Sequence, residues 1–232
     1  MNTRGYQEAS VDRTHRWAER CLREHRRLTE QRAGKPYQAL FGVIQGAQYE
    51  DLRRRAARGL AGLEVDGQRF DGFGLGGALE KQRLGEIIGW MVEELPEDKP
   101  RHLLGISEPE DLFEAVAMGA DTFDCVNPSR VGRNAAIYTA DGRYNVNTAR
   151  HRRSALPLEE GCDCLTCRHY TRAYVHHLFK AKEMLASTLA TIHNERFTVR
   201  LVDDMRRAIS AESFAQFRDE FLARYRAGAA RG

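Results

Sequence analysis

The chain has 232 residues, of which 42% are hydrophobic, and this is enough for one large domain or for a domain with a small appendage. It carries 36 Lys and Arg residues against 33 Asp and Glu residues, a net charge of only +3. No apolar stretch approaches the length of a transmembrane helix and Met1–Tyr6 forms no apolar signal region, so we expect a cytoplasmic protein with no membrane partner. Five cysteines, three of them clustered, indicate reduced thiols and metal rather than a secreted disulfide framework.

A long helix and four strand–helix units are predicted along the first half of the chain. The charge-rich stretch from Ser10 to about Gln31 has a narrow apolar stripe and predicts the helix. Short apolar runs then alternate with segments of helical spacing, which predicts βα units and an α/β fold with a parallel sheet. Four such units do not close an eight-stranded barrel, so the sheet is either open or half of a barrel. The expected strands are 39–44, 70–75, 102–106 and 122–126, and the expected helices are 49–63, 80–95 and 111–118.

Local signals refine the elements that follow the third strand. Ser107 to Glu110 has the form of a capping box, with Pro109 at an early helix position. After Pro128 the composition becomes that of an Arg- and Asn-rich loop, with a small hairpin expected around Asp141-Gly142. A last amphipathic helix is expected from about Ser213 to Tyr225.

Three cysteines in the pattern C-x-C-x2-C carry the strongest chemical signal. Thiolates this close together cannot all find disulfide partners among themselves, but they can share one tetrahedral Zn²⁺ with an imidazole, and a closed four-ligand site is structural. The cysteines are Cys162, Cys164 and Cys167, and the histidines that compete to be the fourth ligand are His169, His176, His177 and His193.

His193 can be a ligand only if the chain between Cys167 and His193 folds back on itself. The 25 intervening residues have helical spacing, and a straight helix of that length would separate the two ligands by roughly 37 Å. Zinc requires ligand atoms about 4 Å apart, because its bonds are near 2 Å. The break is expected at Ala186–Thr188.

Polar side chains lie at the ends of the first and fourth expected strands. Asp124 ends the fourth strand in an apolar run, where it would be partly desolvated at the catalytic face of a parallel α/β fold. Carboxylates serve as nucleophiles toward anomeric carbons, although this aspartate could equally cap the following loop. Arg130 and Arg133 can hold phosphates next to a sugar or can be ordinary surface arginines. Gln45 ends the first strand and offers an amide suited to a base edge.

The glycine pattern and the charge distribution are weaker signals. Gly72, Gly74 and Gly77 match G-x-G-x-x-G but lie inside or at the end of a strand, so they indicate close approach of a flat ligand rather than a dinucleotide site. From Asp124 to Arg200, twelve Lys and Arg residues stand against seven Asp and Glu residues, and five of the eight histidines fall there. This surplus suggests a phosphate-bearing partner, although charge alone favours an ordinary solvated surface.

Six motifs occur in one order along the chain. They are Phe41–Gly46 (FGVIQG), Phe73–Gly77 (FGLGG), Leu104–Asp111 (LGISEPED), Phe123–Arg130 (FDCVNPSR), Cys162–Cys167 (CDCLTC) with Tyr170–Tyr174 (YTRAY), and Ile192–Asn194 (IHN). Together they resemble the tRNA-guanine transglycosylases, or queuine tRNA-ribosyltransferases, from about Val11 to the C-terminus. The resemblance implies a pentosyltransferase (glycosyltransferase) that exchanges the wobble guanine of tRNA for a 7-deazaguanine such as queuine or preQ1.

The resemblance also implies the roles of individual residues. Asp124 would be the nucleophile that displaces guanine and holds the ribose covalently. The base would be bound by Gln45, Gly76, Gly77, Ala78 and Leu104. RNA would be bound by Gly105, Ile106, Ser107, Glu108, Pro109, Glu110 and Asp111, and by Ser129, Arg130, Val131, Gly132 and Arg133. One structural Zn²⁺ would be held by Cys162, Cys164, Cys167 and His193, and no redox cofactor is implied.

The domain organisation implied by the resemblance has three parts. Residues 1–148 would form the second half of a TIM (β/α)8 barrel with an N-terminal helix, 149–200 a zinc-binding subdomain, and 201–232 a C-terminal helical segment. The family's N-terminal half carries the acid/base aspartate and a second aspartate that recognises the base. We therefore expect a homodimer or a complementing N-terminal half, and no turnover by the chain alone.

Two departures from the family pattern and one alternative function complete the expectations. Ala78–Lys81 and Asn127 differ from many members and could change which deazaguanine is accepted. The alternative function is that of a non-catalytic, zinc-stabilised subunit that binds tRNA or acts as a scaffold.

Overall fold

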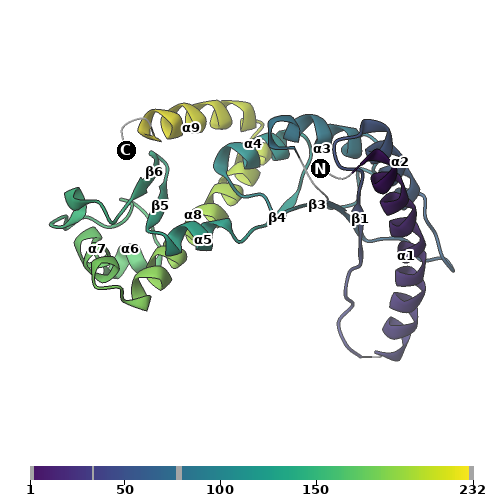
Figure 1. The fold of residues 1–232 in the computed structure, drawn as a ribbon, viewed down its shortest axis with the longest axis horizontal. Helices are drawn as coiled ribbons and strands as arrows, with labels where there is room; N and C mark the ends of the chain where they lie inside the picture. The colour runs from purple at the N-terminus through teal and green to yellow at the C-terminus, as the bar shows by residue number, and fades with distance from the viewer. Residues whose placement is uncertain (1–2, 33, 77–79, 230–232) are drawn as a thin grey trace. The chain divides into compact units, whose positions relative to one another are not determined.

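The computed structural model describes residues 3–32, 34–76 and 80–229, which fall into two compact units (Figure 1). Unit 1 comprises Met1–Ile106 and Glu114–Asp124, and unit 2 comprises Ser107–Phe113 and Cys125–Gly232. One long helix, α8 (Met184–Ser210), lies within unit 2. Among the described residues, no helix is both long and apolar enough to cross a membrane.

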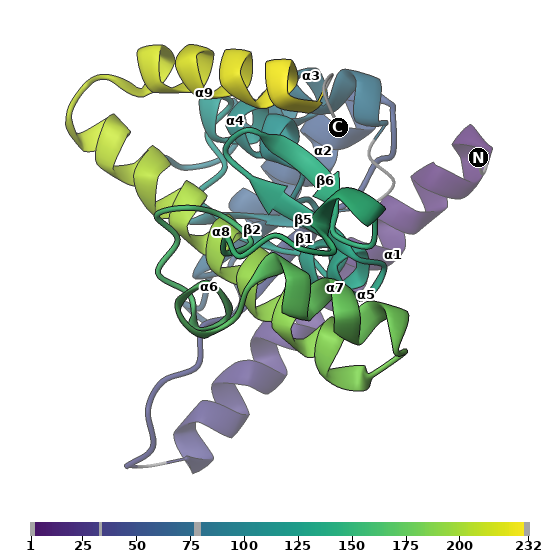
Figure 2. The same cartoon turned by 90° about the vertical axis from the view of Figure 1, so that its left-hand side faces the viewer.

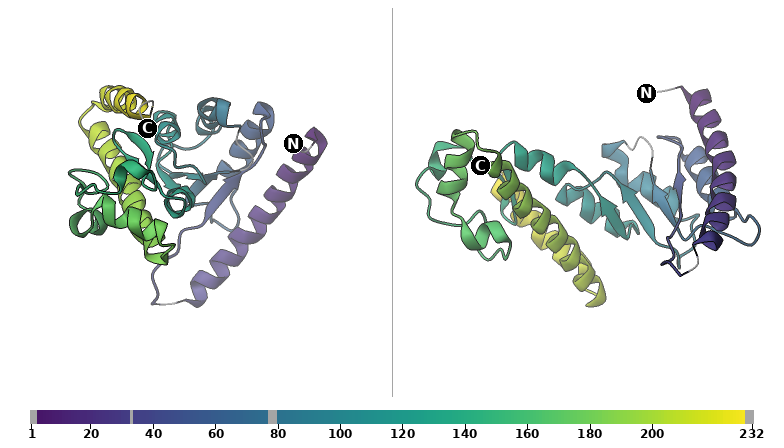
Figure 3. Two further views of the ribbon diagram at one scale, coloured as in Figure 1. Left: turned by 60° about the vertical axis from the view of Figure 1, so that its left-hand side comes forward. Right: turned by 90° about the horizontal axis from the view of Figure 1, so that it is seen from below.

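Unit 1 is built on a four-stranded parallel sheet in the order β1-β2-β3-β4, which confirms the predicted α/β fold. The helix α1 (Arg4–Gln31), purple in Figure 3, precedes the sheet and contacts α2. The strands are β1 (Phe41–Ile44), β2 (Gly72–Leu75), β3 (Arg101–Leu104) and β4 (Thr122–Asp124). The connecting elements are α2 (Glu50–Ala61), the 3-10 turn η1 (Lys81–Arg83), α3 (Leu84–Val92) and α4 (Pro109–Ala117).

One face of this sheet is buried against helices. Ile44, Leu75 and Leu103 are fully buried in one apolar cluster with Leu60 of α2 and Ile87 of α3. Each side chain of this size contributes about 1.5–3 kcal/mol when it leaves water. Alternate residues of a strand point to the opposite face, so the next side chains along these strands face away from the helices.

The carboxyl ends of the four strands are aligned. Ile44 of β1 pairs with Leu75 of β2, Leu75 pairs with Leu103 of β3, and Leu104 pairs with Asp124 of β4. The residues at or just after the strand ends, including Gln45, therefore share one edge of the sheet. In open parallel sheets, ligands bind outside this edge.

Unit 2 is organised around α8, which contacts α5, α6, α7, α9 and β5 (Figure 2). A buried apolar cluster between them includes Ile137, Val175 and Leu189. The predicted hairpin and the predicted last helix are both confirmed. The elements are α5 (Asn127–Arg133), β5 (Ala136–Thr139), β6 (Gly142–Asn145), the 3-10 turn η2 (Ala149–His151), α6 (Leu165–His169), α7 (Arg172–Lys180), α8 and α9 (Phe214–Ala229).

The predicted capping box is wrong. Helix α4 begins at Pro109, and the Glu108 carbonyl accepts a hydrogen bond from the Leu112 amide at 2.9 Å. Because proline is best tolerated in the first helical position, the cap falls on Glu108 rather than on Ser107. Within the described residues, the buried Ser107 hydroxyl has no hydrogen-bond partner.

Two further local predictions are corrected by the structure. The Arg- and Asn-rich segment after Pro128 is not a loop but α5, which accommodates Pro128 in its first turn, where no intrahelical amide bond is lost. The chain turns back at 181–183 and not at Ala186–Thr188, which lies inside α8. Lys182 adopts the left-handed conformation (φ 59°) that ends α7, and the Glu183 amide donates to the Leu178 carbonyl at 3.0 Å.

Candidate functional site

Asp124 stands at the carboxyl end of β4, where the resemblance places the nucleophile. Its Oδ1 accepts a hydrogen bond from the Gly105 amide at 3.3 Å and lies 3.1 Å from His102 Nε2. Its side chain is 60% exposed and is therefore not desolvated as expected. The reason is that β4 ends the strand order of the sheet and has a neighbouring strand on one side only.

His102 is a site residue that sequence reasoning missed. Its Nδ1 lies 2.9 Å from Thr122 Oγ1, while its Nε2 contacts Asp124. The register that pairs His102 with Thr122 brings the imidazole beside the carboxylate. A single strand sequence does not reveal that register, because it depends on which residue of β4 lies opposite.

The residues of β2 are all buried, and the side chains of Val43 and Leu104 lie over Gly74 and Gly76. A Cβ atom on Gly76 would lie 2.8 Å from Val43 Cγ1 and 3.0 Å from Leu104 Cδ1, and one on Gly74 would lie 3.2 Å from Val43 Cγ2. Glycine is required for this close approach. Val43 and Leu104 are each 37% exposed, and Gln45 follows β1 directly and is half-buried. The predicted contacts Gly77 and Ala78 lie outside the described residues.

Arg53 of α2 is a second residue that was missed, and it ties the ends of β1 and β2 together. It is fully buried, and its Nε donates to the Ala47 carbonyl at 2.7 Å. Its Nη1 donates to the carbonyls of Ile44 and Gly76. Burial lowers the pKa of Arg53 to about 10. The sequence did contain a signal for this role, because Arg53 is a charged residue beside Leu52 on the apolar face of a predicted helix.

The first predicted RNA-binding segment is largely engaged within unit 2. Glu108 Oε1 accepts hydrogen bonds from Asn127 Nδ2 at 2.6 Å and from the Tyr138 hydroxyl at 3.0 Å. Glu110 forms an ion pair with Arg226 at 2.6 Å. Of the remaining residues, Pro109 and Asp111 are buried with Ser107, whereas Gly105 and Ile106 belong to unit 1.

The second predicted RNA-binding segment forms α5. Arg130 and Arg133 are exposed, and the described part of the structure shows no ion pair for either. The Ser129 hydroxyl donates to the Val126 carbonyl at 2.9 Å, and Val131 is half-buried. Gly132 is buried against α8, where an added Cβ would lie 3.1 Å from the Thr191 amide nitrogen. The two arginines are therefore the side chains of this segment that are open to a phosphate.

A cluster of three thiols and one imidazole in unit 2 can hold a metal ion. The ligand atoms of Cys162, Cys164, Cys167 and His193 all lie within 4.8 Å of one another. His193 Nδ1 is 3.3 Å from Cys167 Sγ and 3.6 and 3.7 Å from the other two sulfurs. Its Nε2 lies 2.8 Å from the Tyr138 carbonyl, which can only accept, so Nε2 carries the proton and Nδ1 faces the thiols.

The three thiols perturb one another, and hydrogen bonds with Cys162 and Cys164 raise the pKa of Cys167. Hydrogen bonding by the Cys162 thiol lowers the pKa of Cys164, whose sulfur also accepts the Cys167 amide at 3.3 Å at the start of α6. Thiolate is the form that binds metal. Of the competing histidines, His176 is committed to the Val146 carbonyl through Nδ1 at 2.9 Å, and the cluster contains neither His169 nor His177.

Comparisons with known proteins agree with the motif order. Residues 1–227 match the family model described as Queuine tRNA-ribosyltransferase. The queuine tRNA-ribosyltransferase of Symbiobacterium thermophilum is 44% identical over 228 residues, which is 97% of this chain and 54% of that protein. Those of Geobacillus thermodenitrificans and Bacillus subtilis are 43% and 41% identical, over 96% and 95% of this chain and 56% and 55% of theirs.

The chain belongs to the queuine tRNA-ribosyltransferase family. The resemblance drawn from the six motifs is thereby confirmed, and the family is one of transferases that modify tRNA. The chain spans about half the length of the curated relatives it matches.

In this member of the queuine tRNA-ribosyltransferase family, Asn194 supports the metal cluster from the adjacent position on α8. It is fully buried, and its Oδ1 accepts the Tyr138 amide at 3.1 Å. Its Nδ2 donates to the carbonyls of Pro128 and Ala136 at 3.0 and 2.9 Å. One side chain thus joins α8 to β5 and α5, a role that its place in the IHN motif did not reveal.

Replacing Asn194 with Ala is expected to lower the free energy of unfolding by about 2–5 kcal/mol, because buried backbone groups lose their partners. Urea denaturation of the metal-loaded chain measures this. Asn134→Ala is the matched control, since Asn134 is exposed and makes one bond to the Arg130 carbonyl. Equal losses for the two variants would contradict the role assigned to Asn194.

Proposed function

We propose that this chain carries the nucleophile, the base-binding surface and the zinc subdomain of a tRNA-guanine transglycosylase. The observation that carries the proposal is the exposed Asp124 carboxylate at the carboxyl-end edge of the sheet, bonded to the Gly105 amide. The exposed side chains of Val43 and Leu104, which lie over Gly74 and Gly76, offer an apolar surface to a purine-like base. In this proposal, the four strands of unit 1 are the second half of a (β/α)8 barrel.

The proposed reaction is a double displacement at C1′ of the wobble nucleoside. An Asp124 oxygen attacks C1′, the C1′–N9 bond breaks, and guanine leaves with a proton on N9. The incoming 7-deazaguanine then loses its N9 proton and attacks C1′, which releases the carboxylate. No electrons are gained or lost. Because Oδ1 is held by Gly105, we assign the attack to Oδ2.

The proton transfers need a general acid/base, which the family carries in its N-terminal half. We propose that this group comes from that half, in the same polypeptide or in another. Gln45 and Leu104 would contact the base, together with Gly77 and Ala78. Arg130 and Arg133, with the loop that begins at Gly105, would contact the RNA.

We further propose that the Cys3His cluster holds one Zn²⁺ as a structural ion. Three thiolates and an imidazole complete a tetrahedral shell, which leaves no coordination position for water or substrate. The hydrogen bond from His193 Nε2 to the Tyr138 carbonyl fixes the imidazole orientation that this shell requires.

Base exchange measured with labelled guanine and tRNA tests the proposed function. With a supplied N-terminal half from a relative, we expect incorporation of label, whereas we expect no turnover by the chain alone, because it lacks the general acid/base that typically contributes 10²–10⁴-fold. Turnover by the chain alone at the complemented rate would contradict the need for that half. tRNA binding without exchange or covalent adduct in both arms would instead support the non-catalytic binding subunit.

A further inference from the structure

A large open pocket in unit 2 is not used by the proposed base exchange. It has a volume of about 1010 Å³ and lies among the β5–β6 turn, the segment around η2, and one side each of α7, α8 and α9. Five arginines and one histidine line it, against three carboxylates. The arginines therefore outnumber the carboxylates, and some of them are not neutralised by an ion pair within the pocket.

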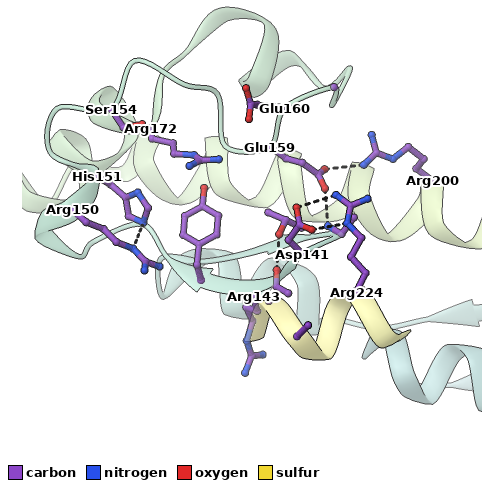
Figure 4. A pocket seen from close by; sticks show the side chains of 17 residues that line it. Asp141, Arg143, Arg150, His151, Ser154, Glu159, Glu160, Arg172, Arg200 and Arg224 are labelled. Atoms are coloured by element: carbon purple, nitrogen blue, oxygen red, sulfur yellow. Dashed lines mark hydrogen bonds and ion pairs between the residues drawn. The ribbon is translucent and has the colours of Figure 1, made fainter. Parts of the chain in front are cut away.

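At one end of the pocket the charges are paired. Arg224 binds both carboxylate oxygens of Asp141, at 2.5 and 2.9 Å, and Arg200 pairs with Glu159 at 2.8 Å. Arg143 is directed outward and pairs with Glu108 at 3.5 Å. Figure 4 shows Asp141, Arg200 and Arg224 together at this end. These contacts leave little unbalanced charge here.

The other end carries the unbalanced positive charge. Figure 4 shows Arg150, His151, Ser154 and Arg172 gathered there, away from Arg200. Arg172 is held by a hydrogen bond from its Nε to the Pro157 carbonyl at 2.7 Å, and its guanidinium lies over the Tyr144 ring at 5.3 Å. These contacts orient the group without neutralising it. Within the described residues, Arg172 has no ion pair with a carboxylate.

Arg150 is oriented in a similar way. Its Nε donates to His151 Nε2 at 3.1 Å, so this nitrogen of the buried imidazole is an acceptor and His151 is neutral. Burial, followed by the charges of Arg150 and Arg172, lowers the pKa of His151 to about 4. The neighbouring Arg152 and Arg153 are exposed and do not line the pocket. Across residues 3–32, 34–76 and 80–229, the structure pairs none of these three arginines with a carboxylate.

The geometry points to a phosphate-binding site at this end of the pocket, with the guanidiniums of Arg150 and Arg172 as its ligands and the Ser154 hydroxyl beside them. Two oriented guanidiniums match the oxygens of a phosphate, and neither must break an ion pair to bind it. Among the described residues, Glu160 is the pocket carboxylate that forms no ion pair, and it is exposed. The ligand is either a phosphodiester of an RNA backbone or a free phosphate.

The site stands independently of the base-exchange proposal, because it includes no residue of the sheet edge in unit 1. Phosphate binding can therefore fail while Asp124 still forms its adduct, and the reverse can also occur. The two proposals are separated by measuring binding here and covalent adduct formation there.

The test uses the full metal-loaded chain and two probes, inorganic phosphate and a tRNA anticodon hairpin. The variants are Arg150→Gln alone, which removes an exposed side chain, and Arg150→Gln with Arg172→Gln. The matched control is Arg206→Gln with Arg218→Gln, which removes the same charge from α8 and α9 outside the pocket. NMR titration follows phosphate binding, and hairpin affinity is measured at several salt concentrations.

If the ligand is an RNA phosphodiester, the slope of log K against log salt should fall by about 1 in the double variant and stay unchanged in the control. If the ligand is free phosphate, the NMR shifts around His151 should disappear in the variants while the hairpin slope stays unchanged. In wild type, bound phosphate should also raise the pKa of His151. The proposal is overturned if wild type shows no phosphate-induced shift at His151 and all variants share one hairpin slope.

Discussion

Replacing Cys164 with Ser is expected to abolish tight metal binding and to unfold the segment from Cys162 to His193 before the rest of the chain. The serine hydroxyl is a poor metal ligand at neutral pH, whereas it can still cap α6 in place of the thiol. Structural zinc sites in small domains contribute apparent binding free energies of about 10–16 kcal/mol. Losing one of four ligands therefore removes a large share of the stability of this part of unit 2. Treatment of the wild type with a chelator should give the same result.

Metal content by mass spectrometry and hydrogen exchange over residues 162–193 measure this effect. Cys21→Ser is the matched control, because Cys21 is an exposed cysteine on α1 in unit 1. Its metal content and exchange should equal those of the wild type. If chelation leaves the exchange of 162–193 and the melting profile unchanged, the cluster does not hold a structural metal.

Replacing Asp124 with Asn is expected to lower base exchange by the complemented protein by on the order of 10⁴-fold or more, as loss of a catalytic nucleophile does elsewhere. The amide has nearly the shape of the carboxylate but lacks its negative charge, so it cannot form the bond to C1′. Because the side chain is 60% exposed, stability should change by no more than about 0.5 kcal/mol. A denaturing gel with labelled tRNA shows whether a covalent adduct forms.

Asp98→Asn is the control for this experiment, since Asp98 is an exposed aspartate of unit 1 that precedes β3 rather than following the carboxyl end of a strand. It should form the adduct as the wild type does. If the Asp124→Asn variant still forms the adduct, Asp124 is not the nucleophile, even if tRNA binding is intact.

The sequence was sufficient to predict most elements of the fold and the metal cluster. Strands β1 to β4 are short apolar runs separated by amphipathic helices, and this pattern depends only on the neighbours of each residue along the chain. The C-x-C-x2-C spacing brings three sulfurs together within one turn and the start of α6, so the ligands are nearly complete before any tertiary contact forms. His193 was implied by the family resemblance and now lies in that cluster.

The errors arose where two local signals compete. Ser107 and Glu110 form a capping pattern, but the requirement of Pro109 for the first helical position moved the cap to Glu108. The turn back toward the metal cluster fell on Lys182, a residue type that carries no turn signal and that rarely adopts a positive φ. The first error thus came from a local preference of proline, and the second from a turn that its residue types do not signal.

The chain's own sequence thus determined which segments become strands and helices, where the thiols cluster, and which family the motifs belong to. Only the tertiary structure decided that His102 contacts Asp124, that Arg53 joins the ends of two strands, and that Arg150 and Arg172 line one pocket. Helices and strands can be predicted from hydrophobic periodicity, because this periodicity depends only on residues that are close together in the sequence. Contacts between residues about 20 or more positions apart follow from register and packing, which no single segment of the sequence contains.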